Sequence, residues 1–271
     1  MNILLLSRRF EIYSTQRLVQ EGASLGLTVS LWDPGKPFSE YVSAGLKMPD
    51  LVLPRLGSYE FSQALQVVEG FENAGVVCVN SSRAYKKSRN KWTLYQELVR
   101  QSLPTPKTWL YSEDLVLEYP VVLKVLESSQ GDGVVLAQSR EDVLKFKSEF
   151  PGEKFLVQEW ICEAQGSDYR ALVVGDKVVA AMKRTAAPGD FRSNLHKGGQ
   201  AEECILSLEE EQLALSLARH LDLQIAGIDF LRSQRGSLLL EANPCPGLEG
   251  IEACTKLNLA RKILETISVR P

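Results

Sequence analysis

Three oxygen-bearing side chains near the end of the chain could meet at one point. They lie on two apolar segments that a short, glycine-containing turn separates. A three-residue hairpin loop at this turn would pair Ser233 with Ser237, and the resulting register puts Asp229 opposite Glu241. Because side chains alternate along a strand, Asn243 shares their face.

A divalent cation would explain why two carboxylates stand side by side on apolar strands. Such a pair repels itself and loses hydration unless a positive charge neutralises it. Magnesium commonly sits on one or two carboxylates and completes its octahedron with water and nucleotide phosphates. Asp229, Glu241 and Asn243 therefore predict a metal site with a phosphate ligand, and Asp229→Ala or Glu241→Ala should abolish turnover while leaving the fold intact. The alternative is a register shifted by one residue, with one acid solvated at a strand edge.

Two lysines and one turn could contact phosphate. Lys124 lies inside an apolar run, where an ammonium group is unexpected unless it snorkels or meets an anion. The turn that follows, residues 128–133, could offer backbone N–H groups to phosphate oxygens. The ordinary alternatives are a surface lysine before a hairpin turn and, for Lys91, a solvated position on a polar helix face.

Segment 183–199 concentrates basic residues in a chain that is acidic overall. It holds four cations against one acid: Lys183, Arg184, Arg192, Lys197 and Asp190. Its length and its glycines are typical of a functional loop, and its charge indicates an anionic ligand. A flexible surface loop is the alternative. His196 is isolated and gains no catalytic role.

The elements that must position these groups divide the chain into parts. The first eighty residues alternate short apolar runs with amphipathic ones, which predicts a small parallel α/β sheet. The first strand is not followed by G-x-G-x-x-G, which argues against a Rossmann-type oxidoreductase. A polar-faced helix over 81–102 leads to a compact α+β lid, and further strands with a helix over 209–221 precede the closing strand pair.

Composition narrows the partners. A net charge of -3 argues against nucleic acid or a membrane surface as the main partner, and no apolar run approaches the length of a membrane span. Five scattered cysteines without a Cys-x-x-Cys pair favour a reducing cytoplasm over a disulfide or zinc scaffold.

Taken in order, these motifs resemble the ATP-grasp superfamily, and RimK-type glutamate ligases in particular. The resemblance runs nearly end to end and is densest in these segments: Val122-Leu-Lys124 with Gln130-Gly-Asp-Gly-Val134, Val157-Gln-Glu-Trp-Ile161, Glu163 to Arg170, Gly189 to His196, and Leu240 to Ile251. It implies a mixed α/β and α+β chain with the ATP-grasp fold. The expected parts are an N-terminal Rossmann-like pre-ATP-grasp α/β domain over 1–88, a small central lid over 89–156, and a C-terminal α+β domain with the metal site over 157–271.

The resemblance also implies roles for individual residues. Those expected around ATP and magnesium (or manganese) are Lys91 and Lys124 at the phosphates, Gln158, Glu159, Trp160 and Ile161 at the adenine hinge, Asp168 at the ribose, Arg192 and Asn194 at the phosphates or acyl group, and Asp229, Glu241 and Asn243 at the metal. We further assign Arg170 to the acyl phosphate and Arg184 to a substrate carboxylate, with Arg55 as a third substrate candidate.

The implied reaction joins a carboxylate to an amine through an acyl phosphate, with ATP and an anionic amino acid, glutamate first, as substrates. A protein or peptide C-terminus is the expected acceptor. Related enzymes that modify a ribosomal protein continue past the final helix, whereas this sequence stops at Pro271, and Lys183 and Thr185 also depart from their pattern. Two alternatives stay open, a ligase for a small molecule or an amino-group carrier protein, and a nucleotide-binding module without catalysis. The oligomeric state, including a homo-oligomer, is open as well.

Overall fold

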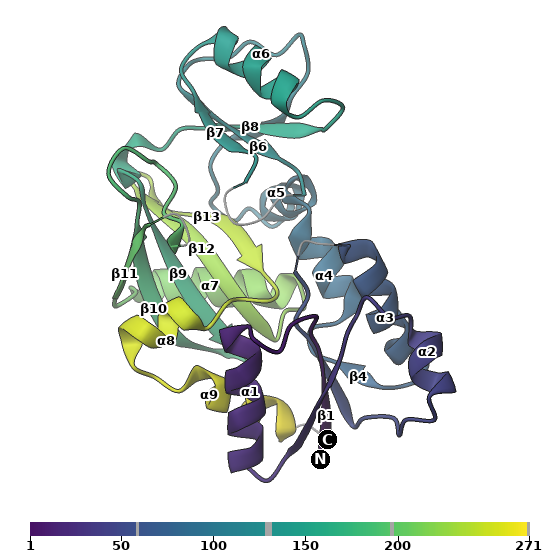
Figure 1. Ribbon diagram of the computed structural model, residues 1–271. Helices are drawn as coiled ribbons and strands as arrows, with labels where there is room; N and C mark the ends of the chain where they lie inside the picture. The colour runs from purple at the N-terminus through teal and green to yellow at the C-terminus, as the bar shows by residue number, and fades with distance from the viewer. Residues whose placement is uncertain (58–59, 128–131, 196–197, 270–271) are drawn as a thin grey trace.

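A computed structural model describes residues 1–57, 60–127, 132–195 and 198–269 (Figure 1). The described residues form three separate sheets, and the figure shows the one that carries β6, β7 and β8 standing apart from the other two. In the described part of the chain, no helix combines the length and the apolar character that a membrane crossing requires.

The first sheet is parallel, with the strand order β2-β1-β3-β4. Its elements are β1 (Asn2–Leu6), α1 (Tyr13–Ser24), β2 (Thr28–Trp32), α2 (Phe38–Ser43), β3 (Leu51–Pro54), α3 (Phe61–Asn73) and β4 (Val77–Cys78). The apolar residues of β1 and β3 are buried, as expected for parallel strands covered on both faces. The prediction of a small parallel α/β sheet is confirmed.

The predicted helix over 81–102 is two helices, α4 (Ser82–Arg89) and α5 (Lys91–Arg100). Asn90 separates them, because its side chain accepts hydrogen bonds from the backbone N–H groups of Trp92 and Thr93, both at 3.1 Å. This cap starts a new helix at Lys91 and fixes where that lysine leaves the backbone.

The small sheet is antiparallel, with the order β5-β8-β6-β7. It comprises β5 (Thr108–Leu110), β6 (Val121–Val125), β7 (Val134–Ala137), α6 (Arg140–Glu149) and β8 (Phe155–Glu159). A capping box between Ser139 and Asp142 begins α6, which packs over the sheet. We propose the three-part division expected from the sequence, whose boundaries follow residues 88 and 156, with one adjustment at the second boundary. Because β8 pairs with β6 over 155–159, the second boundary falls inside a strand of the small sheet, and that part extends to Glu159.

The large sheet is antiparallel, with the order β11-β10-β9-β12-β13. Its elements are β9 (Ser167–Val174), β10 (Lys177–Thr185), β11 (Gln200–Glu203), α7 (Leu208–His220), β12 (Ile225–Ser233) and β13 (Gly236–Asn243), with a short 3-10 turn η1 (Cys162–Ala164) before it and α8 (Glu249–Thr255) and α9 (Leu259–Ser268) after it. One face packs on α7 through Ala171, Ile228 and Phe230. The other joins α8, α9 and the first sheet in one core, so the chain's two ends share their packing.

Candidate functional site

The predicted pairing of Asp229 with Glu241 forms, by a register that differs from the expected one. Ser233 pairs with Gly236, so the hairpin loop has two residues and the expected pairing with Ser237 is wrong. A β-bulge between Asp229 and Phe230 then shifts the register by one residue. Asp229 consequently pairs with Glu241, as predicted.

The face that carries this pair is polar where the opposite face is apolar. Ile228 and Phe230 point to α7, so Asp229 between them points to the other side of β12. The same alternation puts Asp168 and Arg170 of β9 on that side, because Ala171 and Val173 face α7. Arg184 joins them, because Met182, two residues earlier on β10, packs in the core on that face.

Two arginines on neighbouring strands compensate the charge of Asp229. Arg170 donates to both carboxylate oxygens of Asp229, at 2.6 and 2.7 Å, and Arg184 adds a bond of 2.8 Å. Arg184 also holds both oxygens of Asp168, each at 2.6 Å. The like-charge crowding expected from the sequence is therefore already compensated by guanidinium groups on neighbouring strands.

Burial and the neighbouring arginines together shift the pKa values of Asp229 and Asp168 in opposite directions. Burial raises the pKa of Asp229, but Arg170 and Arg184 outweigh it, so the pKa lies below the usual carboxyl value. Burial raises the pKa of Asp168, and the single arginine beside it does not offset this effect. Burial lowers the pKa of Arg184, and the two acids reverse that shift and raise it.

Lys124 and Lys91 approach Glu241 from outside the large sheet. Lys124 is only 7% exposed, so the alternative of a surface lysine is wrong. Burial lowers the pKa of Lys124 to about 8, Glu241 opposes the shift and Lys91 reinforces it. Burial also lowers the pKa of Lys91, again opposed by Glu241. Both lysines line one pocket with Gln158 of β8 and Leu240 of β13.

The end of β8 forms a well-anchored turn between the small and large sheets. Gln158 is buried, and its amide donates to the Thr108 hydroxyl at 2.9 Å. The carboxylate of Glu159 accepts from the backbone N–H of Lys107 at 2.7 Å and from Arg235 at 2.6 Å. These bonds tie β8 to β5 and to the β12–β13 turn.

Trp160 and Ile161 continue this turn toward the basic loop. Ile161 is buried, and Trp160 meets Phe191 edge to face with ring centroids 5.6 Å apart. Figure 1 shows the loop between β10 and β11 rising toward the small sheet, and a pocket lined by Gly189–Arg192 and 134–136 lies between them.

Segment 183–199 is a loop only in part. Lys183 and Arg184 belong to β10, which runs to Thr185, so the loop prediction is wrong for these residues. Within the loop, the guanidinium of Arg192 pairs with Asp190 at 2.8 Å, and the backbone oxygen of Asn194 accepts from Gly199 at 3.2 Å. His196, Lys197 and residues 128–131 of the expected phosphate turn lie outside the described residues.

The loop after β13 is held from several directions. Asn243 accepts the backbone N–H of Cys245 at 2.9 Å, which turns the chain away from the sheet. Arg55 donates to the backbone oxygen of Pro246 at 2.7 Å, and the backbone N–H of Leu248 donates to the Ser14 hydroxyl at 2.9 Å. The first sheet and α1 thus support the segment that carries Asn243.

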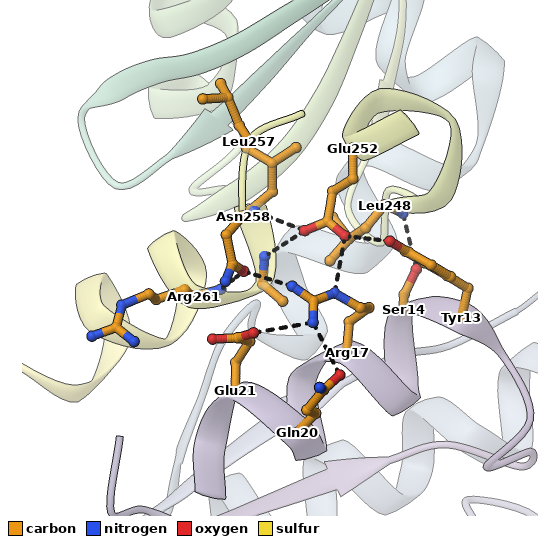
Figure 2. A network of polar contacts seen from close by, with 12 residues as sticks. Tyr13, Ser14, Arg17, Gln20, Glu21, Leu248, Glu252, Leu257, Asn258 and Arg261 are labelled. Atoms are coloured by element: carbon orange, nitrogen blue, oxygen red, sulfur yellow. Dashed lines mark hydrogen bonds and ion pairs between the residues drawn. The ribbon is translucent and has the colours of Figure 1, made fainter. Parts of the chain in front are cut away.

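A buried carboxylate that sequence reasoning missed completes this support. Figure 2 shows Glu252 of α8 between α1 and the start of α9. It accepts from the Tyr13 hydroxyl at 2.8 Å, from Arg17 at 3.3 Å, and from the backbone N–H groups of Leu259 and Ala260 at 2.7 and 3.1 Å. Tyr13 and Arg17 lie more than 230 residues from Glu252 in sequence, so local patterns could not predict these contacts. The Asn258 helix cap beside them is a local signal.

The donor set suits magnesium in chemical type. Carboxylate and amide oxygens are the ligands that this hard ion takes. Within the described residues, the Glu241 side chain accepts no hydrogen bond, whereas Asp229 and Asn243 already serve N–H donors. The described residues include no cluster of three or more His, Cys, Asp or Glu side chains arranged as a metal site. Glu241 would therefore be the carboxylate most available to magnesium. Asp229 would have to divide its oxygens between the ion and the two arginines.

Comparisons with known proteins cover almost the whole chain. A RimK-like ATP-grasp domain matches residues 88–267, and a RimK PreATP-grasp domain matches residues 1–85. A relative from Shewanella loihica named "Probable alpha-L-glutamate ligase" is 42% identical over 98% of this chain and 95% of that relative.

Two solved structures share the fold. The RimK domain protein ATP-grasp from Sphaerobacter thermophilus has a TM-score of 0.74 at 18% identity, over 99% of this chain and 100% of that one. The ATP-grasp ligase PsnB, in complex with its minimal precursor, Mg and ADP, has a TM-score of 0.72 at 15% identity, over 98% and 97% of the two chains. Both agree with the fold expected from the sequence.

Proposed function

Because the chain belongs to the RimK-like ATP-grasp family and is an ATP-dependent ligase, we propose that it adds glutamate to the C-terminus of a protein or peptide. The observation that carries the proposal is that Lys91 and Lys124 line one pocket and that the carboxylate of Glu241 interacts electrostatically with both. Two ammonium groups that line one pocket, one of them buried, are suited to contact an anionic ligand. A triphosphate with its magnesium ion would bring the phosphate oxygens to the lysines and the cation to the carboxylates.

The expected roles around ATP are kept as proposals. Lys91 and Lys124 neutralise phosphate oxygens, and the backbone of the turn from Gln158 to Ile161 meets adenine, with Glu159 and Trp160 fixing its course. Asp168 is proposed for the ribose, and Arg192 and Asn194 for the phosphates or the acyl group. Magnesium is proposed on Asp229, Glu241 and Asn243, where it would screen the charge between the phosphates and these acids. Manganese would suit the same oxygen donors.

The chemistry needs positioning and charge neutralisation more than proton transfer. A substrate carboxylate oxygen attacks the γ-phosphorus of ATP, the bond to the β-phosphate oxygen breaks, and an acyl phosphate and ADP result. The amine of the incoming amino acid then attacks the acyl carbon, phosphate leaves, and the amine loses a proton as the amide forms. Arg170 and Arg184, held in place by Asp229 and Asp168, are proposed to stabilise the negative charge of the acyl phosphate and to bind a substrate carboxylate.

Mass spectrometry of acceptors tests the reaction class. The enzyme is incubated with ATP, magnesium, glutamate and a panel of peptides, and ADP release is followed in parallel. We expect products heavier by one or more glutamyl residues with wild type, and none with Lys124→Met. ADP release with another amino acid and never with glutamate would overturn the glutamate assignment. A wild-type protein that releases no ADP with any carboxylate would be a nucleotide-binding module instead.

A further inference from the structure

Two arginines, Arg55 and Arg89, lie near the loop after β13: Arg55 donates to the backbone oxygen of Pro246, and Arg89 interacts electrostatically with Cys245. On α4, Tyr85 and Arg89 are four residues apart and therefore share a helix face. The Tyr85 hydroxyl donates to the backbone oxygen of Pro54 at 2.8 Å, so this face meets the end of β3, where Arg55 follows. Arg55 in turn reaches across to Pro246.

Arg89 differs in its partners from the other arginines that carry proposed roles. Arg170, Arg184 and Arg192 each bond an aspartate. Arg89 is half-buried and stacks on Phe61, with its guanidinium carbon 4.3 Å from the ring centroid, and it forms no salt bridge within the described residues.

The electrostatic surroundings of Arg89 point the same way. Burial lowers its pKa, and the groups that oppose this shift are Tyr85, Cys245 and Glu127. Glu127 accepts a hydrogen bond from Asn90 and no salt bridge from Arg89. A guanidinium that has lost part of its hydration and forms no salt bridge with the described residues is suited to an anionic ligand.

The position of these arginines selects the substrate over the nucleotide. In parallel α/β sheets, ligands bind beyond the carboxyl ends of the strands where the strand order reverses. The order β2-β1-β3 places that reversal beside β1 and β3, and Arg55 stands directly after β3. Lys91 lies two residues beyond Arg89, so an anion held by Arg89 would adjoin the proposed phosphate site.

We propose that Arg89 and Arg55 form the site that binds a carboxylate of the amino acid substrate. The inference rests on the proposed function for the nature of that substrate. The planar guanidinium of Arg89, already oriented by Phe61, can grip both oxygens of a carboxylate, and Arg55 approaches from the facing strand end.

Steady-state kinetics of Arg89→Met test the site. The substitution keeps an extended side chain and removes the charge, and Arg89→Lys keeps the charge but loses the two-pronged geometry. Arg83→Met is the matched control, because Arg83 is exposed on the same helix. We expect the KM for glutamate to rise about ten- to hundredfold in Arg89→Met and less in Arg89→Lys, with the KM for ATP within about twofold of wild type. Arg83→Met should leave both KM values unchanged.

Neutral analogues provide the second measurement. Wild type should discriminate between glutamate and either glutamine or the glutamate α-amide, and Arg89→Met should lose most of that discrimination. An unchanged KM for glutamate, or an equal rise for ATP, overturns the site while leaving the ligase function standing. If Arg89→Met does not fold, as judged by thermal unfolding, Arg55→Met and Arg89→Lys decide by the same criteria. If wild type uses another amino acid, that substrate replaces glutamate, and a wild type inactive with all of them refutes both proposals.

Discussion

Replacing Asp229 by asparagine should separate the structural from the metal-binding contribution of this acid. The exchange preserves shape and removes the charge that faces Arg170 and Arg184. Arg184 keeps Asp168, so Arg170, whose side chain is 14% exposed, becomes the uncompensated cation. Breaking a buried ion pair by removing one partner costs about 3–5 kcal/mol. Because one arginine keeps a partner, we expect about 3 kcal/mol.

The stability loss can be measured as a shift in unfolding temperature without metal or nucleotide. For a chain of this size, about 3 kcal/mol corresponds to a fall of about 6–12 °C. Asp176→Asn, in an exposed turn between β9 and β10, is the matched control and should not change the unfolding temperature. The sequence alone predicted only that removal of Asp229 leaves the fold intact, and the arginine contacts now add the expected loss of stability.

Glu241→Gln provides the contrast. The Glu241 carboxylate accepts no hydrogen bond within the described residues, and Lys124, with a pKa of about 8, can release its proton when the acid is lost. We therefore expect a smaller change in unfolding temperature than for Asp229→Asn, together with loss of magnesium-dependent turnover. An Asp229→Asn protein that unfolds within about 2 °C of wild type would refute the buried ion-pair reasoning.

Two further predictions concern Lys124 and Glu252. The pKa of Lys124 is about 8 in the folded chain and takes the ordinary value of 10.5 in the unfolded chain. Between these pH values the unfolded state binds more protons than the folded state, so the free energy of unfolding should rise with pH. Urea unfolding of the nucleotide-free protein measures this rise. ATP affinity should fall over the same window as the ammonium group loses its charge, and Lys124→Met should remove the contribution of this group to both pH dependences. Glu252→Gln should lower the free energy of unfolding by about 2–4 kcal/mol, because Arg17 and two backbone N–H groups lose a charged acceptor. Urea denaturation beside Glu265→Gln, which removes an exposed pair with Arg261, measures the difference, and equal losses in the two variants would contradict the role of Glu252.

Local patterns predicted the strands that carry the site. Alternation of polar and apolar residues placed Asp229, Glu241 and Asn243 on one face. The apolar run around Lys124 singled out that lysine but left open whether it is exposed or buried, and the structure shows it buried. Patterns of this kind depend on neighbours in sequence. They also supported the resemblance to RimK-type ligases, which the family comparison confirms.

Features that depend on distant partners were beyond the same reasoning. The strand position of Arg184 follows from pairing with β9 and β11, while the glycines after it favoured a loop. The break at Asn90 was available as a helix-cap signal, but the charges on both sides suggested one continuous polar face. The neutralisation of Asp229 by arginines required the order of strands in the sheet, which the sequence does not state.

In the last hairpin, a turn one residue shorter than expected is compensated by one extra residue in β13. If the ladder had no bulge at Leu240, the two-residue turn would pair Asp229 with Leu240. Glu241 would then point into the core against α7. A homologous hairpin with a turn one residue longer and an unbroken ladder would present the same acids in the same place. A one-residue gap in an alignment at this turn is therefore compatible with an intact site, provided that one additional residue lies between the turn and Glu241.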